Sequence, residues 1–384
     1  MKKNKYLALI LGLGILVFCG FYFSETGLLG SLEKRCKTIA NSDSKNSCWR
    51  KVVDKSLLSG DLGKSMDVIA FFYEDDPEFS ENCHDFVHLL GKDAYRLFSE
   101  GKNFSVSPKT SYCSYGFYHG FMESLVGKSG DIEMARRFCD FIDSELSKDS
   151  ASATLACFHG IGHGWANIHD EKLKGDERAM VYPALDLCQK VTQDPEELKI
   201  CATGVFDSIS LGYYNNLNGL VMNKKDPFWL CWEQEERFKT PCYMDLGPAI
   251  LWLGGDDLKG ALNYLPYVES EYKELEVQTI AENSVNFIIK EKRDVKTQIE
   301  VCRSLGGKLY TACIKGLSGG FLQFSKPGRE HEQAIGFCQS EFLNTNEKET
   351  CYEKILNDLV VGVSSEKYEE ICSSTGRYEK YCLN

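Results

Sequence analysis

The sequence predicts an all-α protein of repeated antiparallel helix pairs, an α/α solenoid-like arrangement in which disulfides join neighbouring helices, with one N-terminal transmembrane anchor. Three observations support this prediction. Apolar residues recur every three or four positions, as at Val87, Leu90, Ala94 and Leu97, which is the period of a helix, while strand-like alternation is scarce. Seventeen cysteines are spread along the 384 residues. An apolar stretch long enough to span a membrane lies near the N-terminus.

The composition is typical of a folded protein outside the cytoplasm. The chain carries 56 acidic against 44 basic residues, a formal net charge of −12, so we expect no nucleic-acid partner. Seventeen cysteines are too many for a reduced cytosolic protein without metal clusters, and no C-x-x-C spacing occurs. The cysteines therefore indicate an oxidising compartment.

Residues 1–23 are interpreted as a signal anchor or a signal peptide. Three of the first five residues are lysines, and the uncharged stretch 6–23 would form roughly 27 Å of helix, close to the thickness of a bilayer core. No small-residue cleavage triplet follows, and Phe18 precedes Cys19 where a lipoprotein signal has a small residue. We expect an uncleaved anchor, with the lysines cytoplasmic and the rest of the chain on the periplasmic or extracellular face. A cleaved signal peptide is the alternative.

The cysteines and histidines divide the remaining chain. A linker at 24–35 leads to histidine-bearing helical repeats at 36–255 and then to C-terminal helical repeats at 256–384, which lack the histidine cluster. Apart from Cys19, the cysteines form neighbouring couples, most of them 10 to 18 residues apart, the length of a short connection between helix ends. We predict a disulfide in each couple: Cys36 with Cys48, Cys83 with Cys113, Cys139 with Cys157, Cys188 with Cys201, Cys231 with Cys242, Cys302 with Cys313, Cys338 with Cys351, and Cys372 with Cys382.

The second cysteines of several couples open a shared motif. Cys113, Cys157, Cys201 and Cys313 each begin the pattern C-x-x-G-apolar-x-x-small, and a weaker copy begins at Cys242. First cysteines tend to end a helical pattern, so each couple is expected to join two helices of one repeat unit. Units of this kind contact only their neighbours. An irregular all-α disulfide-rich domain without regular stacking is the alternative.

Histidines supply the candidate site. Two H-x-x-x-H pairs and one H-x-x-x-E pair lie between residues 84 and 163. Side chains four residues apart lie one turn apart on the same face of a helix, where their donor atoms can converge on one ion. The spacing therefore predicts a metal centre with His84, His88, His119, Glu123, His159 and His163 as ligands.

The repeat gives a second argument for this centre. Aligned on the opening cysteine, the seventh position holds His119, then His163, then Asp207, so these side chains should line one groove, and Asp207 joins the candidate ligands. Glycines flank them, as at Gly120 and Gly164. Because an interior glycine costs a helix about 1 kcal/mol relative to Ala, we expect these backbones to approach another helix or a bound ion closely.

Nitrogen and oxygen ligands suit a transition metal, Zn, Fe or Cu, and the set suffices for one ion or for two bridged by Glu123. A Cys/His zinc site is a competing arrangement, because Cys83 adjoins His84, but the disulfide couples account for the cysteines. Histidines that only hydrogen-bond between helices are the non-metal alternative.

The function predicted is that of an exported, membrane-anchored metalloprotein, a metal-dependent enzyme with redox or hydrolytic chemistry on an extracytoplasmic substrate. The alternative is a non-catalytic helical-repeat scaffold that binds a protein partner on the repeat surface.

Overall fold

The structure is a computed structural model that describes residues 35–57, 62–102, 105–150, 152–166, 173, 175–326 and 329–382. Throughout these residues the regular structure is helical and no strand occurs, which confirms the all-α prediction. The anchor or signal peptide at 1–23 and nearly all of the linker at 24–35 lie outside the described residues. Of the helices described, none combines the length and the apolar character that crossing a membrane requires.

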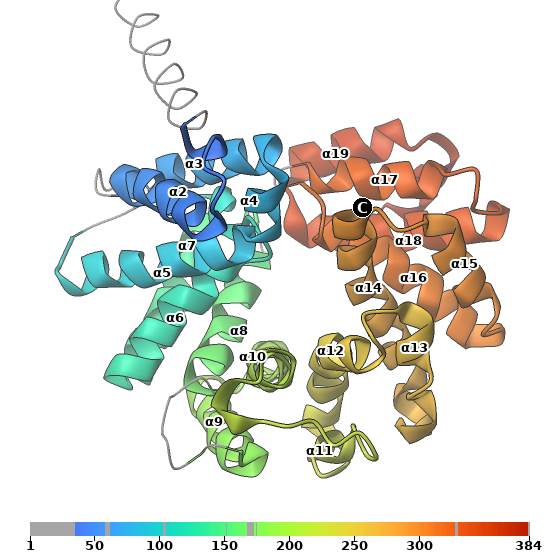
Figure 1. The fold of residues 1–384 in the computed structure, drawn as a ribbon, viewed down its shortest axis with the longest axis horizontal. Coiled ribbons are helices and arrows are strands. Elements are labelled where there is room, and N and C mark those ends of the chain that lie inside the picture. The colour runs from blue at the N-terminus through green and yellow to red at the C-terminus, as the bar shows by residue number, and fades with distance from the viewer. Residues whose placement is uncertain are drawn as a thin grey trace, which may run out of the picture.

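One series of helices passes through the middle of the fold, and each member packs against the next (Figure 1). In order, these helices are α5 (Cys83–Ser99), α6 (Gly116–Ser129), α8 (Ser152–Ala166), α10 (Pro195–Asn215), α12 (Glu236–Leu253), α14 (Lys273–Glu291), α16 (Gly307–Gln323) and α18 (Thr345–Gly362).

The other helices alternate with this series along the chain or flank its two ends. They are α2 (Ser42–Leu57), α3 (Leu62–Asp75), α4 (Pro77–Glu81), α7 (Ile132–Leu146), α9 (Glu177–Val191), α11 (Trp229–Trp232), α13 (Leu258–Leu262), α15 (Val295–Arg303), α17 (Glu330–Gln339) and α19 (Ser365–Ser374). The predicted boundary between residues 255 and 256 falls between α12 and α14, which pack against each other; the two-part division stays a prediction.

The N-terminal and C-terminal parts of the described chain meet. The Tyr73 hydroxyl on α3 donates a hydrogen bond to the carbonyl oxygen of Ser325, just after α16, at 3.4 Å. Figure 1 accordingly shows the blue α4 beside the red and orange helices α17 and α19. The helices therefore form a closed circuit, whereas the sequence predicted only contacts between neighbouring units.

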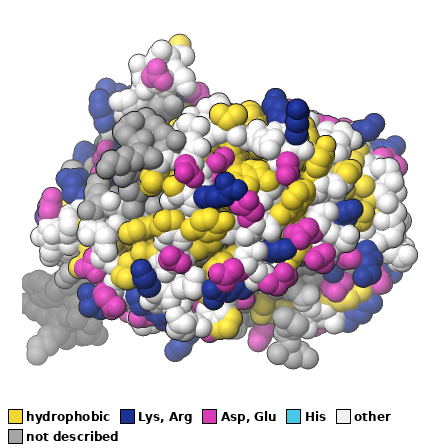
Figure 2. Space-filling view, turned by 90° about the horizontal axis from the view of Figure 1, so that it is seen from below, with side chains coloured by type: hydrophobic (Ala, Val, Ile, Leu, Met, Phe, Trp, Pro, Cys, Tyr) yellow, Lys and Arg dark blue, Asp and Glu magenta, His cyan; other side chains and the backbone are white. Residues whose placement is uncertain are grey.

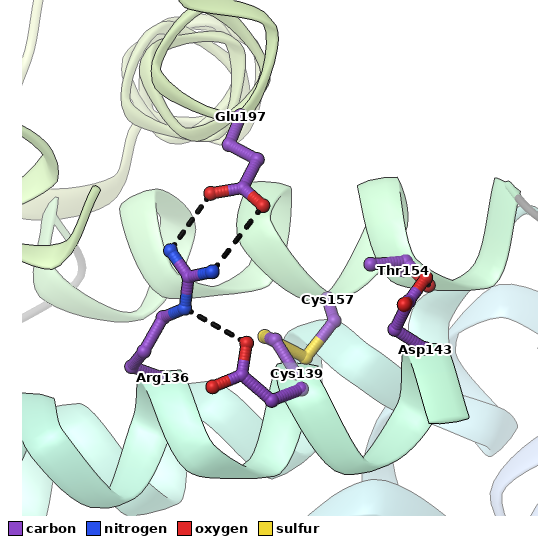
Figure 3. The surroundings of a disulfide bond; sticks show 7 residues. Arg136, Cys139, Asp143, Thr154, Cys157 and Glu197 are labelled. Carbon is purple, nitrogen blue, oxygen red and sulfur yellow. Dashed lines mark hydrogen bonds and ion pairs between the residues drawn. A yellow bond between two sulfur atoms is a disulfide. The ribbon is translucent and has the colours of Figure 1, made fainter. Parts of the chain in front are cut away.

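All eight predicted cysteine couples are disulfide-bonded, including Cys83 with Cys113. Figure 3 shows the bond between Cys139 on α7 and Cys157 on α8. Beside it, Arg136 on α7 pairs with Glu197 on α10, with 2.8 Å between Nη1 and Oε2, so an ion pair ties the next central helix to this unit. A loop of about 15 residues closed by a disulfide is stabilised by roughly 3 kcal/mol in the chain-entropy model.

Glycines allow the central helices to touch backbone to backbone. A Cβ added at Gly120 on α6 would lie 1.8 Å from the carbonyl oxygen of His88 on α5, and one at Gly204 on α10 would lie 1.9 Å from that of His159 on α8. Such distances are far inside van der Waals contact, so only glycine fits. The flanking glycines therefore serve helix crossings, and these crossings bring the histidine-bearing faces together.

Candidate metal centre

The five predicted histidines lie in one cluster where α5, α6 and α8 meet. His119 occupies the middle, with ring centroids 4.8 Å from both His159 and His163, 5.2 Å from His84 and 6.4 Å from His88. The five histidines that were expected to converge are therefore neighbours in the structure. His119 and His163 are buried, with exposures of 7% and 3%. The face drawn in Figure 2 shows rows of apolar side chains among charged ones, and no described histidine is visible on it.

Donor atoms within this cluster form two groups, in each of which the atoms lie within 4.8 Å of one another. Each group contains two histidines and one carboxylate, whereas the sequence predicted one shared set of ligands for one ion or for two bridged by Glu123. Glu123 and Asp207 belong to different groups, and His84 belongs to neither although its ring is inside the cluster. The first group is His119, His159 and Asp207, and the second is His88, Glu123 and His163.

The tautomer of His159 follows from its hydrogen bonds. The Thr203 hydroxyl donates to the carbonyl oxygen of Ile200 at 2.6 Å, so its oxygen accepts from the Nδ1–H of His159 at 2.8 Å. A neutral imidazole protonated at Nδ1 carries its lone pair on Nε2. That Nε2 faces Oδ2 of Asp207, 3.6 Å away. Thr203 therefore holds His159 in the state in which Nε2 can bind a cation.

His84 is oriented in the same way. Its Nδ1 lies 3.0 Å from the carbonyl oxygen of Cys113, which can only accept, so Nδ1 carries the proton and Nε2 carries the lone pair. Cys113, Ser114 and Tyr115 all have φ between 55° and 60°, the left-handed region that non-glycine residues avoid. The Cys83–Cys113 disulfide and the His84 hydrogen bond hold this strained segment beside the cluster.

His119 differs from its neighbours because its buried Nδ1 has no hydrogen-bond partner. Burial lowers the pKa of His119 well below the usual value for histidine, and the surrounding histidines lower it further. Burial also lowers the pKa of His163, to about 4, although Asp207 opposes this effect. Both rings are therefore neutral near pH 7, which is the form that binds metal ions.

The two carboxylates have different surroundings. The His88 Nε2 and the Lys92 Nζ lie 3.1 Å and 2.9 Å from the two oxygens of Glu123. Burial alone would raise the pKa of Glu123, but these hydrogen bonds outweigh burial and lower the pKa to about 2. Asp207 faces Nε2 of both His159 and His163 at 3.6 Å. Burial would raise its pKa too, but His159 and His163 lower it overall when they are protonated, so both carboxylates are charged near pH 7.

The 3.6 Å separations at Asp207 fit a metal ligand set better than a hydrogen bond. An N–H···O hydrogen bond spans about 2.7 to 3.2 Å. Two ligand atoms bound to one tetrahedral zinc ion at about 2.0 to 2.1 Å lie roughly 3.4 Å apart. The His159 nitrogen and the Asp207 oxygen of the first group are therefore spaced for coordination, and the His119 donor atom lies within 4.8 Å of both.

Thr203, Lys92 and Asp245 belong to the surroundings of the site but were missed by the sequence argument. Thr203 occupies the same repeat position as His159, and Lys92 follows His88 by four residues, so both had a spacing signal. Asp245 stands in the weaker Cys242 copy where the other copies have glycine. Its Oδ2 is buried without a hydrogen-bond partner. Burial raises the pKa of Asp245 well above the usual value, and Asp207 contributes to the increase.

A serine-hydrolase pattern elsewhere in the chain has the wrong local structure. Residues 316–320 match G-x-S-x-G, but Ser318 is fully buried inside α16 and its hydroxyl donates to the carbonyl oxygen of Ile314 at 2.7 Å. A nucleophile of this pattern requires a sharp strand-to-helix turn that exposes the hydroxyl. Ser318 therefore serves packing.

Comparisons with protein-family models, curated proteins and solved structures found no match to this chain. The functional argument consequently depends on the geometry of the cluster.

Proposed function

We propose that the protein is an exported, membrane-anchored metalloprotein whose histidine-rich centre binds a transition metal ion, Zn, Fe or Cu, between His119, His159 and Asp207. The observation that carries this proposal is the buried Nδ1 of His119, which has no hydrogen-bond partner. A buried polar atom without a partner costs about 1 to 3 kcal/mol. Coordination within the first group removes that cost if Nδ1 is the donor atom, because it gives the nitrogen a partner.

The main competing explanation is that the histidines only connect helices by hydrogen bonds. Under that explanation each ring would be satisfied by the protein, as His84 is by Cys113 and His159 is by Thr203. His119, the central ring, does not follow this pattern. Glu123 has the ammonium group of Lys92 as a charge partner, whereas no lysine or arginine among the described residues pairs with Asp207. A metal cation in the first group would supply a positive charge beside Asp207.

The location and the repeat arrangement are parts of the same proposal. Eight disulfides are consistent with an oxidising compartment outside the cytoplasm. We propose that residues 1–23 anchor the chain in the membrane and that the helix pairs of 36–255 and 256–384 form one repeat series. The helix-to-helix contacts and the equivalent positions of His119, His163 and Asp207 support the series.

Two histidines and one carboxylate leave coordination positions for a substrate or water. A transition metal held there supplies either Lewis-acid activation or electron transfer, which are the hydrolytic and redox classes of chemistry. The residues of this chain hold the ion, and Thr203 fixes the orientation of His159. We therefore propose a metal-dependent enzyme acting on an extracytoplasmic substrate.

A scaffold that binds a protein partner is the second candidate. Leu217 and Val221, after α10, are exposed apolar side chains. Apolar rows also mark the face in Figure 2. Such surfaces favour protein contacts when they form a continuous patch. Metal content separates the two candidates, because the scaffold has no need of an ion.

The test is the metal content of the full chain isolated from an oxidising compartment, followed by equilibrium dialysis of the metal-free protein against Zn²⁺. His119→Ala should lose tight binding while helix content stays unchanged. His331→Ala is the matched control, because His331 lies on α17, outside the cluster. Tight binding retained by His119→Ala, or absent from the wild type, would overturn the proposal.

A further inference from the structure

We propose that His88, Glu123 and His163 form a second metal site and that Lys92 occupies its cation position. This site takes an ion only after the first group is filled and only when Lys92 moves away from Glu123. This inference rests on the proposed function and deepens it. It assigns the centre two binding steps of unequal affinity and gives one residue control of the second.

The contacts of Glu123 carry the inference. His88 Nε2 lies 3.1 Å from Oε2, and the ammonium nitrogen of Lys92 lies 2.9 Å from Oε1, so both carboxylate oxygens are engaged. An ion that enters this group must replace the ammonium group as the charge partner of Glu123. The ammonium is a compact point charge like a metal ion, so it competes for the same carboxylate.

The first group has no such competitor. Within the described part of the chain, the ion pairs of Asp207 are with His159 and His163 only, both at 3.6 Å, and no lysine or arginine pairs with it. These rings are neutral when they coordinate a metal. The carboxylate of the first group is therefore available to an ion, whereas the carboxylate of the second is occupied.

Lys92 is placed to move without disturbing the cluster. It follows His84 and His88 on α5 at spacings of four residues, so the three side chains lie along one face of that helix. Its side chain is 35% exposed, while that of Glu123 is 17% exposed. The ammonium group can therefore turn into water at the open edge of the centre. Lys92 is therefore a displaceable competitor for Glu123 rather than a fixed structural charge.

The order of filling follows from these charges. The first ion enters the group with the free carboxylate. The second ion is repelled by the first, because the ring of His163 in the second group lies 4.8 Å from that of His119 in the first. It also competes with Lys92 for Glu123. Both effects weaken the second step. Removing the ammonium removes only the competition.

The experiment is a titration of the metal-free full chain with Zn²⁺ against a competing chelator. The wild type should bind in two steps. Lys92→Met should tighten the second step by about two- to fivefold, the effect of losing one partly exposed ion pair, and leave the first step unchanged. Lys92→Arg keeps the charge and should not tighten it. Lys315→Met is the matched control, since Lys315 is 34% exposed and pairs with Glu353 on the far helices α16 and α18.

Each outcome separates this inference from the proposed function. An unchanged or weaker second step in Lys92→Met, or equal tightening of both steps, would overturn the role of Lys92. Binding of a single ion by both the wild type and Lys92→Met would overturn the second site and leave the first intact. Absence of Zn²⁺ binding altogether would instead refute the proposed function.

Discussion

Replacing Thr203 by Val tests whether the hydrogen bond to His159 prepares a metal ligand. Thr203 is buried, and its hydroxyl accepts from His159 Nδ1 at 2.8 Å while donating to the carbonyl oxygen of Ile200 at 2.6 Å. Valine keeps the shape of the side chain and removes the hydroxyl. The His159 ring then loses the acceptor that fixes its proton on Nδ1, so the lone pair on Nε2 is no longer enforced.

Two magnitudes follow from this contact. Loss of the outer partner of a metal-binding histidine lowers metal affinity by about 10- to 100-fold. In the metal-free protein, the buried N–H left without an acceptor costs about 1 to 3 kcal/mol in the free energy of unfolding. A purely structural histidine would show the second effect alone.

The assay combines Zn²⁺ affinity, measured against a competing chelator, with chemical denaturation of the metal-free protein. Thr203→Ser keeps the hydroxyl and should restore most of the affinity. Thr110→Val is the matched control, because the buried Thr110 hydroxyl bonds Ser107 and Tyr118 at 2.6 and 2.8 Å, away from the cluster. Affinity unchanged in Thr203→Val while both valine variants lose stability would refute the reasoning.

Three further predictions concern the surrounding fold. Gly120→Ala places a Cβ 1.8 Å from the His88 carbonyl oxygen and should lower the free energy of unfolding by about 1 to 3 kcal/mol or more. Gly336 in α17 has open space around it, so Gly336→Ala should raise the free energy of unfolding by about 0.4 to 1 kcal/mol. Thermal denaturation compares the two variants. The pKa of His163 is about 4 in the folded protein and about 6.5 in the unfolded chain, so between these pH values the unfolded chain binds more protons. The free energy of unfolding therefore has its full value above pH 6.5 and falls by about 3 kcal/mol as the pH drops to 4. Urea titrations of metal-free wild type and His163→Asn should therefore shift in favour of the variant on acidification, and a constant difference would contradict this. Replacing both Cys188 and Cys201 by Ala should cost roughly 3 kcal/mol, with urea unfolding as the measurement and an unchanged midpoint as the contrary result.

The disulfides and the histidine cluster could be predicted because both involve residues at short, regular intervals along the sequence. Each bond joins cysteines that are near in sequence, and even Cys83 and Cys113 are only 30 residues apart. Their shared seventh position after the opening cysteine led us to expect His119, His163 and Asp207 in one place, and their side chains do lie close together. A period that repeats along a chain becomes a shared face when the units stack.

The division of the cluster into two groups was not predictable from spacing. It depends on how closely the helices cross, which Gly120 and Gly204 determine through backbone contacts. The same limit applies to Thr203, whose role requires its distance from His159 on another helix. Closure of the circuit through Tyr73 and Ser325 joins residues 252 positions apart, and no local pattern specifies such a contact.

X-ray absorption at the zinc edge of the Zn²⁺-loaded full chain tests the central claim most directly. The proposal predicts a first shell of nitrogen and oxygen atoms at about 2.0 to 2.2 Å, with the multiple scattering of at least two imidazole rings. A shell containing sulfur at about 2.3 Å, or one without imidazole scattering, would contradict the account.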